Sequence, residues 1–105
     1  MAVTAIVRFA LPEDKTREAA TAAFEASAPL YRDVEGLIRK YYLLSEDGRT
    51  GGGVYLFNSR EDAERLYDEA WRAGIRERLG AEPSIEYFES PVIVDNDAGA
   101  TVTST

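Results

Sequence analysis

Short segments in which apolar side chains alternate with others recur along the chain. Because successive residues of a strand face opposite sides of a sheet, this period of two predicts strands. The expected strands are 3–10, 37–44, 52–57 and 83–94. Two further segments have apolar residues at every third or fourth position, which is typical of helices with one buried face. The expected helices are 15–28, ended by Pro29, and 59–79, weakened at Gly74.

The connections between these segments carry their own signals. Asp47-Gly48 lies between the second and third strands and predicts a two-residue hairpin turn. Ser59 predicts the N-cap of the second helix, with Asp62 where a capping box usually has Glu. Pro91 falls inside the last strand and favours an edge position or a bulge there.

The order strand, helix, strand, strand, helix, strand predicts a ferredoxin-like βαββαβ fold of the α+β class. In this fold a four-stranded antiparallel sheet carries both helices on one face. We expect one such domain over 1–94, followed by a polar, acidic C-terminal tail over 95–105. The other face of the sheet is not polar enough to meet water alone.

The hairpin turn decides which side chains share a face of the sheet. With Asp47 and Gly48 as turn residues, Lys40 lies opposite Tyr55 on the neighbouring strand. The face of Lys40 then carries Ile38, Lys40, Tyr42, Gly53, Tyr55 and Phe57. The opposite face carries Leu37, Arg39, Tyr41, Leu43, Val54 and Leu56. So large an apolar face predicts a homodimer. A loop longer by an even number of residues keeps this partition, whereas a bulge shifts it.

Composition excludes several classes of function. The 105 residues include 19 acidic and 12 basic side chains, and the net charge of −7 argues against nucleic acid or an anionic membrane surface as partner. No apolar run approaches the ~20 residues of a transmembrane helix. The chain has no Cys and no His, which excludes thiolate nucleophiles, Ser-His-Asp triads and most transition-metal sites. We expect no metal, no cofactor and a cytoplasmic location.

The sequence resembles the YdhR-type monooxygenase family at 35–42 (EGLIRKYY) and 52–57 (GGVYLF). That family is similar in fold to the antibiotic-biosynthesis monooxygenases, and the resemblance covers roughly 3–93. The residue types of the family's pattern recur at Lys40, Gly52, Gly53, Tyr55 and Phe57. The resemblance implies a homodimer in which two sheets pack face to face into a dimeric α/β barrel. It also implies a pocket between each sheet and its own helices.

Lys40 is the leading candidate for chemistry. A Lys in the middle of a strand, between Tyr and apolar neighbours, is unusual on a packed face. One interpretation is a stem that snorkels, with its ammonium at the rim of the sheet. The other is a cation above a pocket, where it would stabilise a bound phenolate or enolate.

Aromatic residues supply the rest of the expected site. Tyr42 and Tyr55 share the face of Lys40, either as core residues or as groups that orient a substrate oxygen. We therefore predict Lys40, Tyr42 and Tyr55 as catalytic residues. The predicted substrate-binding residues are Phe24, Tyr31, Ile38, Phe57, Tyr67 and Trp71. For Tyr67 and Trp71 on the second helix, ordinary core packing is the competing interpretation.

Together with the resemblance, these residues predict a cofactor-independent monooxygenase acting on a planar phenolic or polyketide-like small molecule. Such a site must bind the substrate, favour its anion and keep water from the peroxy intermediate. The alternative is a non-catalytic homodimer of the same fold, which binds a small molecule or has a structural role. A third interpretation is a cofactor-free isomerase or lyase that needs no dioxygen.

Overall fold

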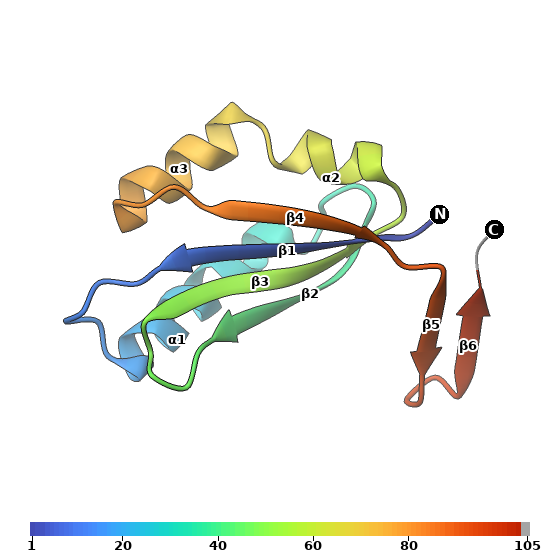
Figure 1. Ribbon diagram of the computed structural model, residues 1–105, viewed down its shortest axis with the longest axis horizontal. Helices are drawn as coiled ribbons and strands as arrows, with labels where there is room; N and C mark the ends of the chain where they lie inside the picture. The colour runs from blue at the N-terminus through green and yellow to red at the C-terminus, as the bar shows by residue number, and fades with distance from the viewer. Residues whose placement is uncertain (104–105) are drawn as a thin grey trace.

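The computed structural model describes residues 1–103 and has the predicted α+β architecture (Figure 1). Its elements in chain order are β1 (Val3–Ala10), α1 (Arg17–Ser27), the 3-10 helix η1 (Ala28–Tyr31), β2 (Leu37–Leu44), β3 (Thr50–Phe57), α2 (Arg60–Leu66), α3 (Glu69–Leu79), β4 (Ser84–Glu89), β5 (Val92–Asp95) and β6 (Ala100–Thr103). The main sheet has the strand order β2-β3-β1-β4, and all neighbours in it are antiparallel. The ferredoxin-like βαββαβ prediction is confirmed.

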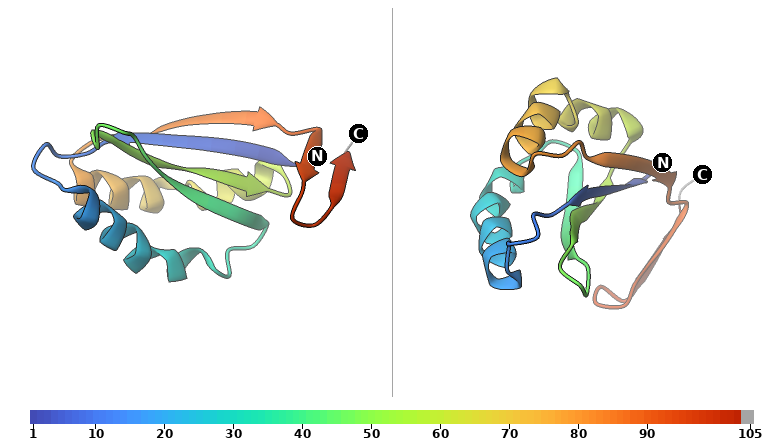
Figure 2. Two further views of the ribbon diagram at one scale, coloured as in Figure 1. Left: turned by 90° about the horizontal axis from the view of Figure 1, so that it is seen from below. Right: turned by 60° about the vertical axis from the view of Figure 1, so that its left-hand side comes forward.

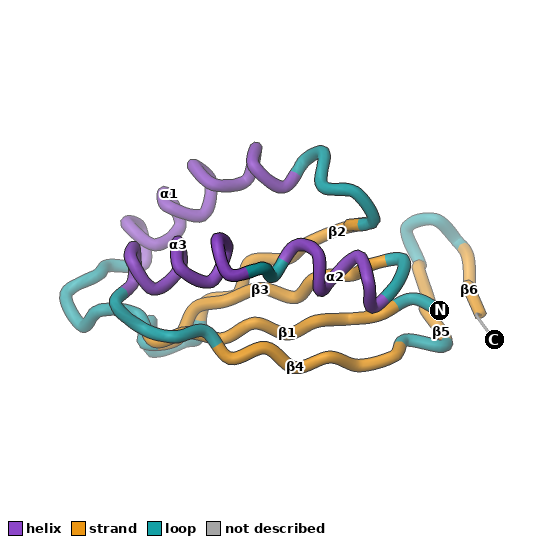
Figure 3. The backbone as a smooth tube through the Cα atoms, turned by 90° about the horizontal axis from the view of Figure 1, so that it is seen from above, coloured by secondary structure: helices purple, strands orange, loops and turns teal. Residues whose placement is uncertain are grey.

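The helices lie on one face of this sheet and leave the other face open (Figure 2). Seen from above, α1 and α3 run alongside each other over the sheet, and α2 follows the line of α3 (Figure 3). The alternation in β1 explains the arrangement, because Val3, Ala5 and Val7 are all nearly fully buried under the helices. Within residues 1–103, no helix has both the length and the apolar character that crossing a membrane requires.

The second predicted helix is two helices, and the break between them is not at Gly74. Ser59 caps α2, as predicted. A second cap follows at Asp68, whose side chain accepts a hydrogen bond from the backbone N–H of Trp71 and starts α3. Helix α3 then continues through Gly74 and ends at Gly80, which has a φ of 71°.

The turn between β2 and β3 is longer than the predicted two residues. The backbone N–H of Ser45 bonds to the carbonyl of Thr50, so residues 46–49 form the loop. Gly48 has a φ of 73°, a left-handed conformation that residues with a Cβ rarely adopt. Because the loop is longer by an even number of residues, the predicted facing pairs are kept, namely Lys40 with Tyr55 and Tyr42 with Gly53.

A bulge at the start of β2 reverses two of the predicted face assignments. Leu37 pairs with Phe57, regular pairing resumes at Arg39, and Ile38 is the extra residue between them. Leu37 therefore packs against the core, whereas Ile38 is 48% exposed. The prediction that Ile38 shares the face of Lys40 is wrong, because one inserted residue inverts the alternation on its N-terminal side.

The last predicted strand does not run through Pro91. Strand β4 ends at Glu89, and β5 and β6 pair as a separate antiparallel hairpin beyond the end of the sheet (Figure 1). Proline has no backbone N–H for the ladder, which is consistent with an interruption at this point. The segment 95–105, expected as a polar tail, thus contributes the second strand of a hairpin, and its residues 104–105 lie outside the described part of the chain.

Candidate functional site

A cavity of about 330 Å³ lies between the sheet and the helices α1 and α3. Strands β1, β2 and β3 contribute to it from below, and η1 contributes Tyr31. Its lining is mainly aromatic and aliphatic, with a few polar groups among them. This volume and this character are typical of sites for small organic molecules.

Small residues make the space for this cavity. Ala20 and Ala23 line it from α1, and Gly52 lines it from β3. At Gly53, an added Cβ would lie 2.9 Å from the ring of Tyr55 and 3.2 Å from Cε of Lys40. A side chain at position 53 would therefore displace the two residues that the hairpin brings together there.

Three tyrosine rings surround the ammonium of Lys40. Its Nζ lies 3.5 Å from the ring centroid of Tyr31, 3.8 Å from that of Tyr42 and 4.6 Å from that of Tyr55. Within residues 1–103, no carboxylate lies within ion-pair distance of this ammonium. The ring faces supply the attraction that a carboxylate would supply elsewhere.

The electrostatic setting of Lys40 keeps both of its protonation states accessible. Burial, with a smaller contribution from the positive charge of Arg78, lowers the pKa of Lys40 to about 7. The negative ring faces act in the opposite direction, because they attract the charged form. At neutral pH the side chain can therefore serve either as a cation or as a proton acceptor.

Hydrogen bonds and stacking hold the aromatic rings in place. The hydroxyls of Tyr42 and Ser27 are 2.6 Å apart, and the ring of Tyr42 stacks on Phe24 with centroids 4.9 Å apart. The indole N–H of Trp71 donates to the hydroxyl of Tyr31 at 3.1 Å. A cavity wall fixed in this way favours a planar ligand that stacks on rings already in position.

Burial also controls the phenols themselves. Tyr55 is 3% exposed, and burial raises its pKa well above the ordinary value for tyrosine. Burial likewise raises the pKa of Tyr42, which the hydrogen bond with Ser27 opposes. Both residues are therefore neutral phenols near pH 7, able to donate a hydrogen bond to a ligand oxygen.

Most of the predicted site residues come together around this cavity. Those that line it are Phe24, Tyr31, Lys40, Tyr42, Tyr55 and Trp71. Phe57 and Tyr67 do not line it: they are 0% and 4% exposed in the core, where Tyr67 packs behind Trp71 with ring centroids 4.7 Å apart. Ile38 also lies away from the cavity, because of the bulge in β2.

Several lining residues were not predicted, and Arg78 is the most important for the chemistry. Trp71, Ile75 and Arg78 are spaced by four and three residues, so they follow one stripe of α3. Had the helical period been continued across Gly74, this stripe would have identified Arg78. Phe9 of β1 also lines the cavity and was not predicted to do so. It alternates in phase with Val3, Ala5 and Val7, so the same pattern could have identified it.

The donor set of the cavity suits anions and phenols more than metal ions. No carboxylate lines it. Within residues 1–103, no group of three or more Asp and Glu side chains is arranged to hold a metal ion. The charged groups of the lining are Lys15, Lys40 and Arg78.

Comparisons with known proteins give the fold a wider context. No protein-family model matches the chain, and no curated protein has a sequence that matches it. Solved structures of the same fold do match. The narrower resemblance to the YdhR-type family stays a prediction.

Three of these structures illustrate the range. The ActVA-Orf6 monooxygenase of Streptomyces coelicolor, solved with nanaomycin D, is 17% identical, covers 89% of this chain and 90% of its own, and has a TM-score of 0.65. SnoaB, a cofactor-independent oxygenase from Streptomyces nogalater, is 16% identical, with coverages of 85% and 92% and a TM-score of 0.63. NE2512 from Nitrosomonas europaea, a protein of unknown function, is 23% identical, with coverages of 85% and 88% and a TM-score of 0.66. The chain shares its fold with a group that includes cofactor-independent oxygenases.

Proposed function

We propose that this protein is a cofactor-independent monooxygenase whose substrate is a planar phenolic or polyketide-like molecule bound in the cavity. The observation that carries the proposal is the position of Lys40, a cation without a carboxylate partner in the described chain, enclosed by three tyrosine rings. The oxygenases of the same fold support the reaction class by analogy.

The chemistry requires little beyond formation and protection of the substrate anion. The neutral amine of Lys40 accepts the proton of a phenol or enol, and the resulting ammonium remains beside the anion. The anion transfers one electron to dioxygen, and the substrate radical and superoxide combine into a peroxide. The ammonium of Lys40 returns its proton to the peroxide anion, and loss of water from the hydroperoxide leaves a new carbonyl, so that one oxygen atom enters the product and the other enters water. Tyr42 and Tyr55 donate hydrogen bonds to the substrate oxygen, and the rings exclude solvent.

Dioxygen consumption tests this proposal directly. Purified protein is incubated with hydroxyanthrones and hydroxynaphthalenes in an oxygen-electrode cell, and products are identified by mass spectrometry. We expect one dioxygen consumed for each product formed, and loss of this uptake in Lys40→Met. Binding without uptake would instead identify a non-catalytic ligand-binding protein, and product formation without dioxygen would identify an isomerase or lyase.

We further propose that the protein is a homodimer whose second copy covers the open face of the sheet. Tyr41 and Phe88 on that face are 56% and 49% exposed, and Ile6, Val54 and Leu56 lie between them, half-buried. Monomeric proteins seldom expose so continuous an apolar surface. Pairing of two such faces would build the dimeric α/β barrel implied by the family resemblance.

A further inference from the structure

Seven of the twelve Lys and Arg side chains form ion pairs in the described part of the chain, and three of the other five line the cavity. The arginines that form ion pairs with carboxylates are Arg8, Arg39, Arg49, Arg60, Arg65, Arg72 and Arg76. The cations that line the cavity, Lys15, Lys40 and Arg78, have no carboxylate within ion-pair distance in the described chain. The remaining two, Arg17 and Arg32, lie outside the cavity, where Arg17 donates to the backbone carbonyls of Ser45 and Glu46.

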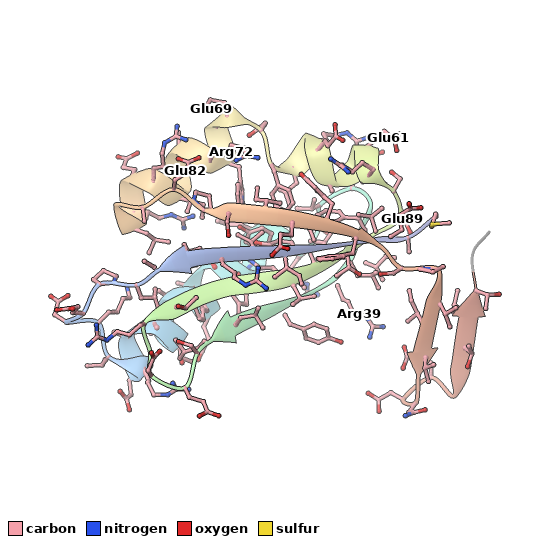
Figure 4. All side chains as sticks on the ribbon, in the orientation of Figure 1. Arg39, Glu61, Glu69, Arg72, Glu82 and Glu89 are labelled. Carbon is pink, nitrogen blue, oxygen red and sulfur yellow. The ribbon has the colours of Figure 1, made fainter. Side chains whose placement is uncertain are left out.

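Helix α3 shows the division within one element. Arg76 pairs with Glu69 and Glu82, and Figure 4 shows Glu69, Arg72 and Glu82 in the region of α3 and of its connection to β4. Arg78, two residues after Arg76, lines the cavity and is exposed to solvent, and it donates a hydrogen bond to the carbonyl of Gly74 at 3.3 Å. The same helix therefore pairs Arg72 and Arg76 with carboxylates and leaves Arg78 without one in the described part of the chain.

The positive charge of the cavity lining is opposite in sign to the net charge of the chain. Acidic residues outnumber basic ones by 19 to 12, yet none of them lines the cavity. Two of the cations that line it repel each other, since the charge of Arg78 lowers the pKa of Lys40. An anionic ligand would relieve this repulsion, because it supplies the missing counter-charge.

The three cations that line the cavity come from different parts of the fold. Lys40 stands in the middle of β2 among the rings. Arg78 lies in the last turn of α3, and Lys15 lies just before α1. Figure 3 shows that the start of α1 and the end of α3 lie at the same end of the sheet. Arg78 and Lys15 thus line the cavity from this end of the sheet, whereas Lys40 lies among the rings.

We propose that the substrate is an aromatic carboxylate, whose phenol lies at Lys40 and whose carboxylate is bound by Arg78 with help from Lys15. This inference rests on the proposed function for the position of the phenol. A guanidinium can bind a carboxylate through two parallel hydrogen bonds, whereas Lys15 contributes as a single charge. The carboxylate would hold the ring at a defined distance from Arg78 and so select which carbon meets dioxygen.

A matched pair of ligands tests this assignment. The compounds 2-naphthol and 6-hydroxy-2-naphthoic acid have the same ring and the same phenol, and differ only by a carboxylate on the far side of the ring. Their binding to the full chain is measured by fluorescence titration. We expect the acid to bind at least tenfold more tightly, because hydrogen bonds to charged groups contribute about 1.5–3 kcal/mol.

Variants then locate the carboxylate. Arg78→Gln is expected to weaken binding of the acid about tenfold and to leave binding of 2-naphthol within twofold. Lys15→Gln should weaken binding of the acid to a smaller extent. Arg76→Gln is the matched control, since Arg76 lies on the same helix with its charge paired outward, and it should change neither affinity. Circular dichroism confirms that each variant is folded.

The outcomes separate this inference from the proposed reaction. Equal affinities for the two compounds, no binding of either, or equal losses for both in Arg78→Gln would overturn the carboxylate assignment. Tighter binding of 6-hydroxy-2-naphthyl phosphate, which keeps the phenol, than of the acid would overturn it in favour of a phosphate. If the acid binds through Arg78 but no dioxygen is consumed, the proposed oxygenase fails while the ligand class stands. If 2-naphthol is oxidised but the acid binds no more tightly than 2-naphthol, the proposed oxygenase stands and the carboxylate assignment fails.

Discussion

Two neighbouring cations of β2 lie on opposite faces of the sheet and differ in whether a carboxylate lies beside them. Arg39 and Lys40 are adjacent in β2 and therefore face opposite sides. On the open face, Arg39 lies 3.3 Å from the carboxylate of Asp95 and 3.4 Å from the hydroxyl of Tyr41. On the helix-covered face, Lys40 has three ring faces and no carboxylate of residues 1–103 within ion-pair distance.

The difference follows from what covers each face. The β5–β6 hairpin brings Asp95 to the open face, in contact with water, where an ion pair forms easily and contributes little. Helices α1 and α3 instead close a mainly apolar cavity over Lys40, where a permanent counter-charge would neutralise the cation before a ligand arrived. An unpaired, partly desolvated cation is costly to folding, so its presence in a cavity is typical of a binding function.

The largest expected effect comes from a charge on the open face. Leu56→Asp places a carboxylate among apolar side chains that, in the proposed dimer, meet a second copy. We expect dissociation or unfolding of the dimer, measured by sedimentation at micromolar concentration. The wild type should sediment at about twice 11.6 kDa. Thr21→Asp on the exposed surface of α1 is the control, and a wild-type monomer would contradict the dimer.

On the other face, Lys40→Met should weaken binding of 2-naphthol tenfold to hundredfold while the protein stays folded. Met keeps the packing of the stem and removes the charge, and a hydrogen bond to a charged group contributes about 1.5–3 kcal/mol. The loss should be larger at a pH where the bound naphthol is ionised than at a pH where it is neutral. Affinity within twofold of wild type at both pH values would show that the ammonium only snorkels to the rim.

A smaller effect is expected in the pH dependence of stability. The pKa of Lys40 is lowered to about 7 by burial from an unfolded value of 10.5, so between these values the unfolded chain binds more protons than the folded one. Stability should therefore rise with pH through this range, because the unfavourable buried charge is lost. Lys40→Met lacks this contribution. The difference in melting temperature between wild type and Lys40→Met should shift in favour of wild type from pH 6.5 to 9, and a constant difference would contradict the lowered pKa.

The smallest effect is expected at Arg39. Arg39→Gln removes the ion pair with Asp95, and an exposed pair of this kind contributes under about 1 kcal/mol. We expect ligand affinity to stay within twofold of wild type and the melting temperature to fall by only a few degrees. A loss of affinity comparable to that of Lys40→Met would show that the two faces are not independent.

Much of this contrast was predictable from local patterns. Alternation placed Lys40 and Tyr55 on one face and opposite each other, and the longer turn left this pairing intact because it added an even number of residues. Ser59 marked the start of α2 correctly. These features depend on neighbours in sequence or on a single hairpin, where backbone geometry leaves few alternatives.

The wrong predictions concern places where a single inserted residue, or the position of a single helix, decides where a side chain lies. Ile38 was misplaced because a bulge inverts the alternation at a single position. The helix break at Asp68 was missed because an Asp within a helical pattern is also an ordinary surface residue. Phe57 and Tyr67 had the residue type of a site but lie in the core. Their burial depends on how closely α2 approaches the sheet.

The sequence by itself determined the order of elements, the strand pairing of the hairpin and the absence of Cys and His chemistry. Tertiary structure alone decided that a cavity exists, because its volume depends on how α1 and α3 are spaced above Gly52 and Gly53. It also decided which cations line the cavity without a carboxylate partner in the described chain, since Arg78 and Lys40 are far apart in sequence and come together only when α3 and β2 enclose the same cavity. Local periodicity specifies which face a side chain occupies, whereas distances between elements come from the packing of the whole core.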